Sequence, residues 1–185
     1  MLSCYEGRFD PSPLDPRLPL YTEYGYDAAG ALINGEIWRA VEHRSLFRID
    51  QTLFSQTFDS IALIQIDGEV LGRTELDNDM NILFVVSLPP DVIGSSASDL
   101  SWLKGRRFVL NGVDHYALVD EWRAGCDRRG WEPPPRVEGT LTFADVSSPA
   151  NSDDSLILAG TFSFTVETDS CGTYEVTHGC FDYGF

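Results

Sequence analysis

The chain consists largely of short apolar or alternating runs that are separated by turn residues. SIALIQI (60–66) and NILFVVSL (81–88) are almost continuously apolar, as is typical of strands buried on both faces. VEGTLTF (137–143) and LILAGTFSFTVE (156–167) alternate apolar with polar residues. Alternation predicts strands with one face in the core and the other in solvent. A further strand is expected over SLFRI (45–49).

Asn-Gly pairs mark two expected hairpins. Asn34-Gly35 divides the apolar stretch GALINGEIWRA, and Asn111-Gly112 lies between RFVL (107–110) and HYALV (115–119). Both residues of such a pair tolerate the positive φ of a type I′ turn, which joins antiparallel strands tightly. Asp67-Gly68 is a third turn signal, after which the apolar pattern resumes.

The order of the elements predicts an all-β fold. Only SASDLSWLK (96–104) has a helical pattern, so one short helix is expected near residues 98–104, ended by Gly105. Roughly nine short strands without strand–helix alternation favour an antiparallel β-sandwich. A lipocalin-like closed barrel is the alternative, and would enclose an apolar cavity.

The C-terminal stretch FSFTVETDSCGTYEVTHGCFDYGF is interpreted as the last hairpin of this fold. Successive side chains of a strand point to opposite faces, so positions of one parity share a face. The parity places these residues in the core: Leu158, Phe162, Phe164, Val166, Tyr174, Val176, His178 and Cys180. Thr161, Ser163 and Thr165 are expected on the opposite, polar face.

Composition and charge narrow the classes of partner. The chain has 185 residues, of which 43% are hydrophobic, and a formal net charge of −16. A surface this acidic repels phosphate backbones, so nucleic acid is excluded as a partner, and an anionic membrane surface is equally unfavourable. We expect a monomer with one folded domain over residues 25–185, preceded by a tail over residues 1–24.

The tail carries a candidate lipidation site at Cys4. Leu2-Ser3-Cys4 matches the end of a bacterial lipobox, in which the cysteine becomes the lipidated N-terminus. Prolines at positions 11, 13, 16 and 19 deny the following stretch regular hydrogen bonding, as expected of an extended tether. The alternative is an ordinary cysteine in an N-terminal tail.

The other three cysteines predict one disulfide. Cys171 lies in the turn of the last hairpin, and Cys126 lies in the loop DEWRAGCDRRGWEPPP, which could reach that turn. We expect a bond between Cys126 and Cys171, with Cys180 a small buried apolar residue. The alternative is that all cysteines are reduced.

No catalytic or metal-binding pattern stands out. His178 and Cys180 are two residues apart, but structural zinc sites take four ligands, usually from paired short motifs, and no second pair is present. The same two residues lack the setting of a Cys-His catalytic dyad. Asp77-Asn78-Asp79 lacks the rest of a calcium loop and is interpreted as an acidic turn. We therefore predict no metal and no cofactor.

Two tryptophans form the candidate ligand site. Trp122 and Trp131 belong to one loop, and exposed tryptophan on a β-sandwich loop can stack on a sugar ring. The alternative, which we favour, is that both rings cover one end of the core.

The two ends of the chain resemble an uncharacterised family of secreted lipoprotein domains of Gram-negative bacteria. Asn34, Gly35 and Trp38 match its N-terminal NGxxW hairpin. Its C-terminal GTFxF…GxFD motif is matched by Gly160, Thr161, Phe162, Phe164, Gly179, Phe181 and Asp182. Members usually have a basic residue at the position of Cys180. The resemblance implies an all-β fold and an exported lipoprotein, and it implies no activity.

The function expected from these observations is binding without catalysis. The leading hypothesis is a lipid-anchored domain of the cell envelope, in the periplasm or on the outer-membrane surface, that binds a small molecule, a glycan or a protein. Its only contact with a membrane would be the lipid anchor. A carrier of a small apolar ligand in a barrel cavity is the second hypothesis, and an envelope hydrolase is favoured least.

Overall fold

The structure is a computed structural model, and it describes residues 12–13, 15–19, 21, 23, 28–40, 44–45, 48–49, 53–58, 61–73, 79–89, 100, 102–120, 136–147, 157–168 and 172–184. These residues contain the strands β1 (Ala28–Ile33), β2 (Glu36–Ala40), β3 (Arg44–Ser45), β4 (Arg48–Ile49), β5 (Leu53–Phe58), β6 (Ile61–Ile66), β7 (Gly68–Val70), β8 (Asn81–Ser87), β9 (Arg107–Leu110), β10 (His115–Asp120), β11 (Arg136–Ser147), β12 (Ile157–Thr168) and β13 (Gly172–Gly184).

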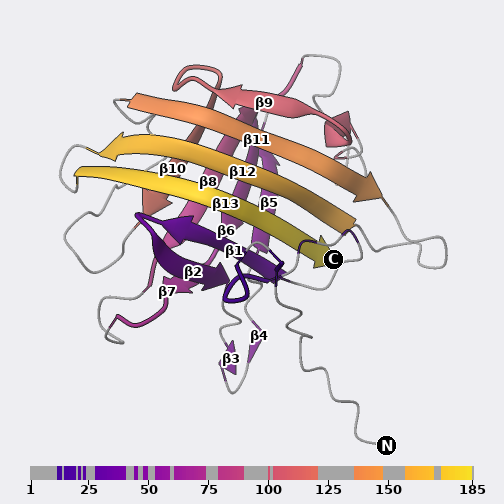
Figure 1. Cartoon of the computed structure of the whole chain (residues 1–185). Helices are drawn as coiled ribbons and strands as arrows, with labels where there is room; N and C mark the ends of the chain where they lie inside the picture. Colours follow the sequence, from indigo (N-terminus) through magenta and orange to yellow (C-terminus); the bar gives the residue numbers. More distant parts are fainter. Residues whose placement is uncertain are drawn as a thin grey trace, which may run out of the picture.

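The strands form two facing antiparallel sheets. The larger has the order β7-β2-β1-β13-β12-β11-β9 and the smaller the order β10-β8-β6-β5, while β3 and β4 pair with each other. The long strands β11, β12 and β13 run across those of the smaller sheet (Figure 1). Within the described strands neither sheet closes on itself. The all-β prediction is therefore confirmed, and the alternative of a closed barrel is not found.

Aromatic rings join the two sheets in the core. Phe84 of β8 contacts Phe162 and Phe164 of β12 edge to face, with ring centroids 5.1 and 5.8 Å apart. Both faces of β6 are buried, as its continuous apolar sequence predicted, since Leu63 and Ile64 are 1% and 0% exposed. The alternation predicted for β12 is also confirmed, because Phe162 and Phe164 are buried whereas Thr161, Ser163 and Thr165 are exposed.

Two turn signals connect the sheets instead of forming hairpins. Asn111-Gly112 was expected to join paired strands, but β9 pairs with β11 and β10 pairs with β8. Similarly, Asp67 links β6 of the smaller sheet to β7, which pairs with β2 of the larger. A turn residue specifies a sharp change of direction and not which strand pairs with which. The prediction of a second Asn-Gly hairpin was therefore wrong.

A β-bulge interrupts β13 at His178. Phe162 of β12 lies opposite Gly179, whereas Phe164 lies opposite Val176. One residue of β12 separates Phe162 from Phe164, whereas two residues of β13 separate Val176 from Gly179. β13 therefore contains one extra residue at this point. His178 has a φ of 55°, in the left-handed region, and its side chain is exposed. A bulge of this kind bends the strand and increases its twist.

The bulge reverses the alternation in the second half of β13. Phe181 and Tyr183 are buried on the core face, at 1% and 3% exposure. Cys180 and Asp182 consequently lie on the outer face of the large sheet. The prediction that His178 and Cys180 share the core face was therefore wrong, because one extra residue transfers every later side chain to the other face.

The N-terminal segment packs against this outer face. Leu18 and Pro19 are buried, and the thiol of Cys180 donates a hydrogen bond to the Pro19 carbonyl at 3.9 Å. A Cβ atom on Gly30 of β1 would lie 2.4 Å from the Pro19 ring, so only glycine leaves space for the proline. Leu18 and Pro19 of this segment are therefore packed on the large sheet.

The helix expected near residues 98–104 is reduced to a tight turn in its described part. Leu100, Trp102 and Leu103 have 3₁₀ geometry, and no α-helix occurs in the portions of the chain that the structure describes. Leu103 is fully buried and the Trp102 ring packs against Phe108 of β9 at 5.8 Å. These apolar residues thus pack against the core, whereas the expected helix is not found in the described part of the segment.

Candidate binding site

The residues predicted from sequence as lipidated, disulfide-bonded or ligand-stacking lie outside the described residues. They are Cys4, Trp122, Cys126, Trp131 and Cys171. The lipid anchor, the Cys126–Cys171 bond and the tryptophan platform therefore remain predictions. Mass mapping of non-reduced peptides would test the bond directly.

Cys180 is a free, buried thiol. Burial raises the pKa of Cys180 to about 11, and the nearby Asp182 carboxylate adds to this effect, while a backbone hydrogen bond from Gly30 opposes it. A thiol with so high a pKa is protonated at neutral pH and is neither a good nucleophile nor a ready metal ligand. The interpretation of Cys180 as a small buried residue is confirmed.

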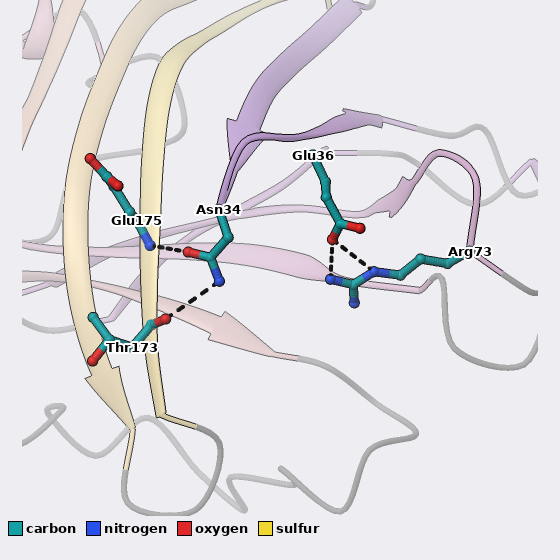
Figure 2. Close-up of polar contacts among 5 residues, drawn as sticks. All are labelled: Asn34, Glu36, Arg73, Thr173 and Glu175. Carbon is teal, nitrogen blue, oxygen red and sulfur yellow. Dashed lines mark hydrogen bonds and ion pairs between the residues drawn. The ribbon is translucent and has the colours of Figure 1, made fainter.

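The N-terminal motif has a structural explanation in the Asn34 side chain (Figure 2). Asn34 has a φ of 51° at the tip of the β1–β2 hairpin. Its Oδ1 accepts a hydrogen bond from the Glu175 backbone N–H at 2.7 Å, and its own N–H donates to the Glu175 carbonyl at 2.8 Å. Asn34 Nδ2 also donates to the Thr173 carbonyl at 3.4 Å. The residue thus makes the turn and attaches the hairpin to β13.

Two further contacts fix the same hairpin. Trp38 of β2 is fully buried, and its indole N–H donates to the Met80 carbonyl at 2.7 Å. Glu36 forms an ion pair with Arg73, which follows β7, as Figure 2 shows. Both contacts join β2 to segments near its neighbour β7. The pattern NGxxW therefore serves the fold in this chain.

The C-terminal motif is explained in the same way. Its phenylalanines Phe162, Phe164 and Phe181 form the aromatic core described above. Its glycines Gly160 and Gly179 lie beneath two of those rings. Because β1 and β13 are neighbours in the large sheet, the two motifs from opposite ends of the chain form one continuous structure. These motif residues support the core, so a binding surface has to be sought elsewhere.

A shallow, open groove of about 500 Å³ lies at the edge of the large sheet that β9 and β11 form. We call it the β9–β11 groove. It is lined by Val109–Val113, from the end of β9 and the following corner, and by Arg136–Gly139, from the start of β11. The two stretches meet because β9 and β11 pair antiparallel, which places Leu110 opposite Gly139. In Figure 1, β9 forms the border of the large sheet beside β11.

Exposed apolar side chains distinguish this groove. Val109 and Val113 are 62% and 76% exposed, and they are the large hydrophobic residues with the most exposure in the described part of the chain. Their neighbours Phe108 and Leu110 point into the core. Side chains of β9 therefore alternate between solvent and core, as expected of a strand. Its solvent face, however, carries valine where a polar residue is usual.

Charged side chains border the valines. Arg136 donates hydrogen bonds to Glu138 Oε1 from Nη2 at 2.7 Å and from Nε at 3.1 Å, and lies 3.8 Å from Glu167. These carboxylates raise the pKa of Arg136, Glu138 contributing most. Arg136, Glu138, Thr165 and Glu167 also enclose a second, smaller depression beside the groove. The whole surface thus combines two apolar contacts with fixed charges of both signs.

The corner beneath the groove is rigidly hydrogen-bonded. Asn111 Oδ1 accepts hydrogen bonds from the backbone N–H groups of Val113 and Asp114 at 2.9 and 3.1 Å. Asn111 N–H donates to the His115 carbonyl at 2.9 Å. His115 Nδ1 in turn accepts from the Ser87 N–H at 3.2 Å, and burial lowers the pKa of His115. This network presents Val113 on a defined backbone.

The sequence contains one signal for this groove. In RFVLNGV, the alternation that buries Phe108 and Leu110 places Val109 on the solvent face. An apolar residue at an exposed position of a short strand, followed by another in the turn, could have indicated a contact surface. Arg136 and Glu138 gave no comparable signal, because charged residues at exposed strand positions are common.

Among the described residues no three His, Cys, Asp or Glu side chains lie close enough to hold a metal ion together. No helix in these residues is long and apolar enough to cross a bilayer. No protein-family model, curated protein or solved structure matches the chain.

Proposed function

We propose that the chain is a non-catalytic binding domain of the cell envelope that holds a partner at the β9–β11 groove. The observation that carries this proposal is the exposure of Val109 and Val113 beside the Arg136 ion pairs. Burying one valine side chain completely stabilises by about 1.5–3 kcal/mol. A partner that covers both gains that energy, less the entropy cost of association.

The motif residues support a binding function over a catalytic one. Residues of the N-terminal motif form the β1–β2 turn and its contact with β13, and the phenylalanines of the C-terminal motif pack in the aromatic core. The thiol that might have served as a nucleophile is buried with a raised pKa. The carrier hypothesis depended on a closed barrel, and the described sheets are open. Binding at an exposed groove is the function that remains best supported.

Mutation of the valines tests the groove. We would display peptide and glycan libraries against the immobilised full chain and measure the Kd of each selected ligand. Val109→Ser combined with Val113→Ser should raise the Kd at least tenfold. The control combines Thr161→Ser and Thr173→Ser, which likewise removes one non-hydrogen atom from each of two exposed side chains of the large sheet. Ligands that bind both double variants equally well would contradict the proposed site.

Attachment to the envelope is a separate part of the proposal. It rests on Leu2-Ser3-Cys4, on the prolines that follow and on the resemblance to secreted lipoprotein domains. Expression of the gene with its upstream region in a lipoprotein-processing host, followed by mass measurement of the mature N-terminus, tests it. A diacyl- or triacyl-modified Cys4 is expected. Membrane-free protein with an unmodified Cys4 would contradict the anchor without affecting the groove.

A further inference from the structure

β9 is the terminal strand of the large sheet, and some of its backbone hydrogen-bonding groups have no partner among the described residues. The Phe143 N–H donates to the Arg106 carbonyl at 2.9 Å, just before β9 begins. In an antiparallel pair, residues that exchange hydrogen bonds alternate with residues that do not. Phe108 and Leu110 therefore bond to β11, whereas the N–H and C=O groups of Arg107 and Val109 point away from it.

Nothing in the described chain pairs with this edge. β9 is the terminal strand in the order of the large sheet, and the strand that follows it, β10, pairs with β8 in the other sheet. An edge strand with free N–H and C=O groups is a template for one further strand. Proteins bind extended peptides in this way, and side-chain contacts at alternate positions then give specificity.

The side chains along β9 define what the added strand should carry. Arg107 and Val109 are both exposed and lie two residues apart, so they share the outer face. Val113 extends the apolar contact beyond Val109 at the corner. A partner strand that fits these positions carries an acidic residue beside Arg107, and an apolar residue two positions away beside Val109.

Charge around the edge supports an acidic partner. The chain as a whole carries a net charge of −16, yet Lys104, Arg106 and Arg107 lie in β9 or just before it. Arg136 lines the groove, where Glu138 and Glu167 pair with it. Lys104 pairs with Asp145, and the Arg106 guanidinium lies 4.1 Å above the Trp102 ring. No ion pair involves Arg107 within the described residues, so its charge is available to a partner.

We propose that β9 binds an extended acidic–apolar peptide as an eighth strand of the large sheet. The inference rests on the proposed function and deepens it, because it names the partner class and the mode of binding at the same groove. A second copy of this chain is a poorer fit. Pairing two β9 edges would bring the Arg107 side chains of both copies to one interface, and like charges across an interface are unfavourable.

Changes to the backbone of the peptide, and separately to the backbone of β9, test the strand pairing. The probe is a capped peptide, Thr-Asp-Thr-Val-Thr-Val-Thr, with a fluorophore for anisotropy measurements. We expect saturable binding to the full chain. N-methylation of the amides of its Asp and Val residues, and separately of its Thr residues, leaves the side chains in place, and in one of the two sets it should raise the Kd at least tenfold. Unchanged binding of both sets would overturn strand addition.

A substitution in β9 provides the counterpart of N-methylation in the peptide. Val109→Pro removes an N–H that β11 does not use, and proline is tolerated on an edge strand whose N–H faces away from its neighbour. It should reduce peptide affinity at least tenfold, whereas Val109→Thr, which keeps the N–H and the size, should retain a larger share of it. Circular dichroism would establish that both variants fold. If Val109→Pro does not fold, the N-methylated peptides decide the question alone.

Further measurements test the role of charge and the possibility that the partner is a second copy of the chain. Arg107→Gln should weaken binding and flatten its dependence on salt, and a peptide with Lys in place of Asp should bind at least tenfold more weakly. One outcome is binding that the Val109→Ser and Val113→Ser changes weaken but that N-methylation of the peptide and Val109→Pro leave unaffected. That result would overturn strand addition while leaving the proposed groove intact. Ligand binding that ignores both valines would overturn both proposals. A dimer in sedimentation that Val109→Pro dissociates would identify the partner as a second copy and overturn the acidic peptide.

Discussion

The ring of Phe162 lies directly over Gly179 on the neighbouring strand. A Cβ atom built on Gly179 would be 2.2 Å from Phe162 Cδ2, which is far inside van der Waals contact. Phe181 and Gly160 repeat the arrangement with the strands exchanged, since a Cβ atom on Gly160 would be 2.6 Å from the Phe181 ring. Each pair is in direct register between β12 and β13. The glycines thus create the space that the aromatic core occupies.

Gly179→Ala should consequently destabilise the protein although it adds only one methyl group. Overpacking a core typically costs about 1–3 kcal/mol, because side chains and backbone have to shift. Truncation of the ring in Phe162→Ala should cost about 3–5 kcal/mol. Thr165→Ala, at an exposed position of the same strand, should cost well under half as much as Phe162→Ala. Midpoints of urea denaturation measure all three.

A double variant tests whether the ring is the cause. Gly179→Ala together with Phe162→Ala should cost less than the sum of the single changes, since the added methyl group enters the space that the ring leaves. Additive costs would show that Gly179 is required for its backbone and not for the ring above it.

Asn34 should contribute through both its conformation and its side chain. Asn34→Gly retains the positive φ but removes the acceptor of the Glu175 N–H, a loss of about 0.5–1.5 kcal/mol. Asn34→Ala removes the same acceptor and also places in the left-handed region a residue that lacks both glycine's freedom and asparagine's polar side chain, which adds about 1–2 kcal/mol. Asn34→Asp keeps the acceptor oxygen and serves as the control. Thermal unfolding should rank the variants Asp, Gly, Ala from most to least stable, and equal losses in Gly and Ala would refute the conformational part.

The architecture could be predicted because burial leaves a periodic trace in the sequence. The continuous apolar runs became β6 and β8 in the smaller sheet, and the alternating run became β12 with Phe162 and Phe164 in the core. Each of these predictions depends only on which residues avoid water. Local pattern was sufficient for them.

Pairing and register were less accessible. The Asn111-Gly112 turn looks the same whether the next strand pairs with the last one or passes to the other sheet, and the second case applies here. The bulge at His178 depends on how β13 fits against β12 and β1 together, which no alternation within β13 reveals. The groove escaped prediction for the same reason, since it exists only where β9 and β11 meet.

Cys180 should react slowly with thiol reagents in the native protein. Its pKa of about 11 leaves little thiolate at pH 8, and the Pro19 segment covers it. A rise of about two units over an ordinary thiol reduces the thiolate roughly 100-fold, before any steric protection is counted. Alkylation followed by peptide mass mapping, in native buffer and in urea, should show Cys180 modified only in urea. Rapid native labelling would mean that the N-terminal segment leaves the sheet readily.

His115 should make the stability of the protein sensitive to pH below neutrality. Burial lowers the pKa of His115, and its Nδ1 has to be unprotonated to accept the Ser87 N–H. The unfolded chain therefore binds a proton at this site more readily than the folded one. Stability is fully present above the ordinary histidine pKa of about 6.5, and it falls as the pH decreases through that value toward the lower pKa of the folded state.

His115→Asn separates this effect from the titration of the many carboxylates. The asparagine Oδ1 can take the place of Nδ1 as an acceptor, but it does not titrate. The free energy of unfolding of the wild type should fall more steeply than that of His115→Asn between pH 7 and 5.5, and the two should change in parallel above pH 7. Since His115 forms the corner beneath Val113, peptide binding at the groove should weaken over the same interval in the wild type alone. Parallel unfolding curves over the whole range would show that His115 is not the group responsible.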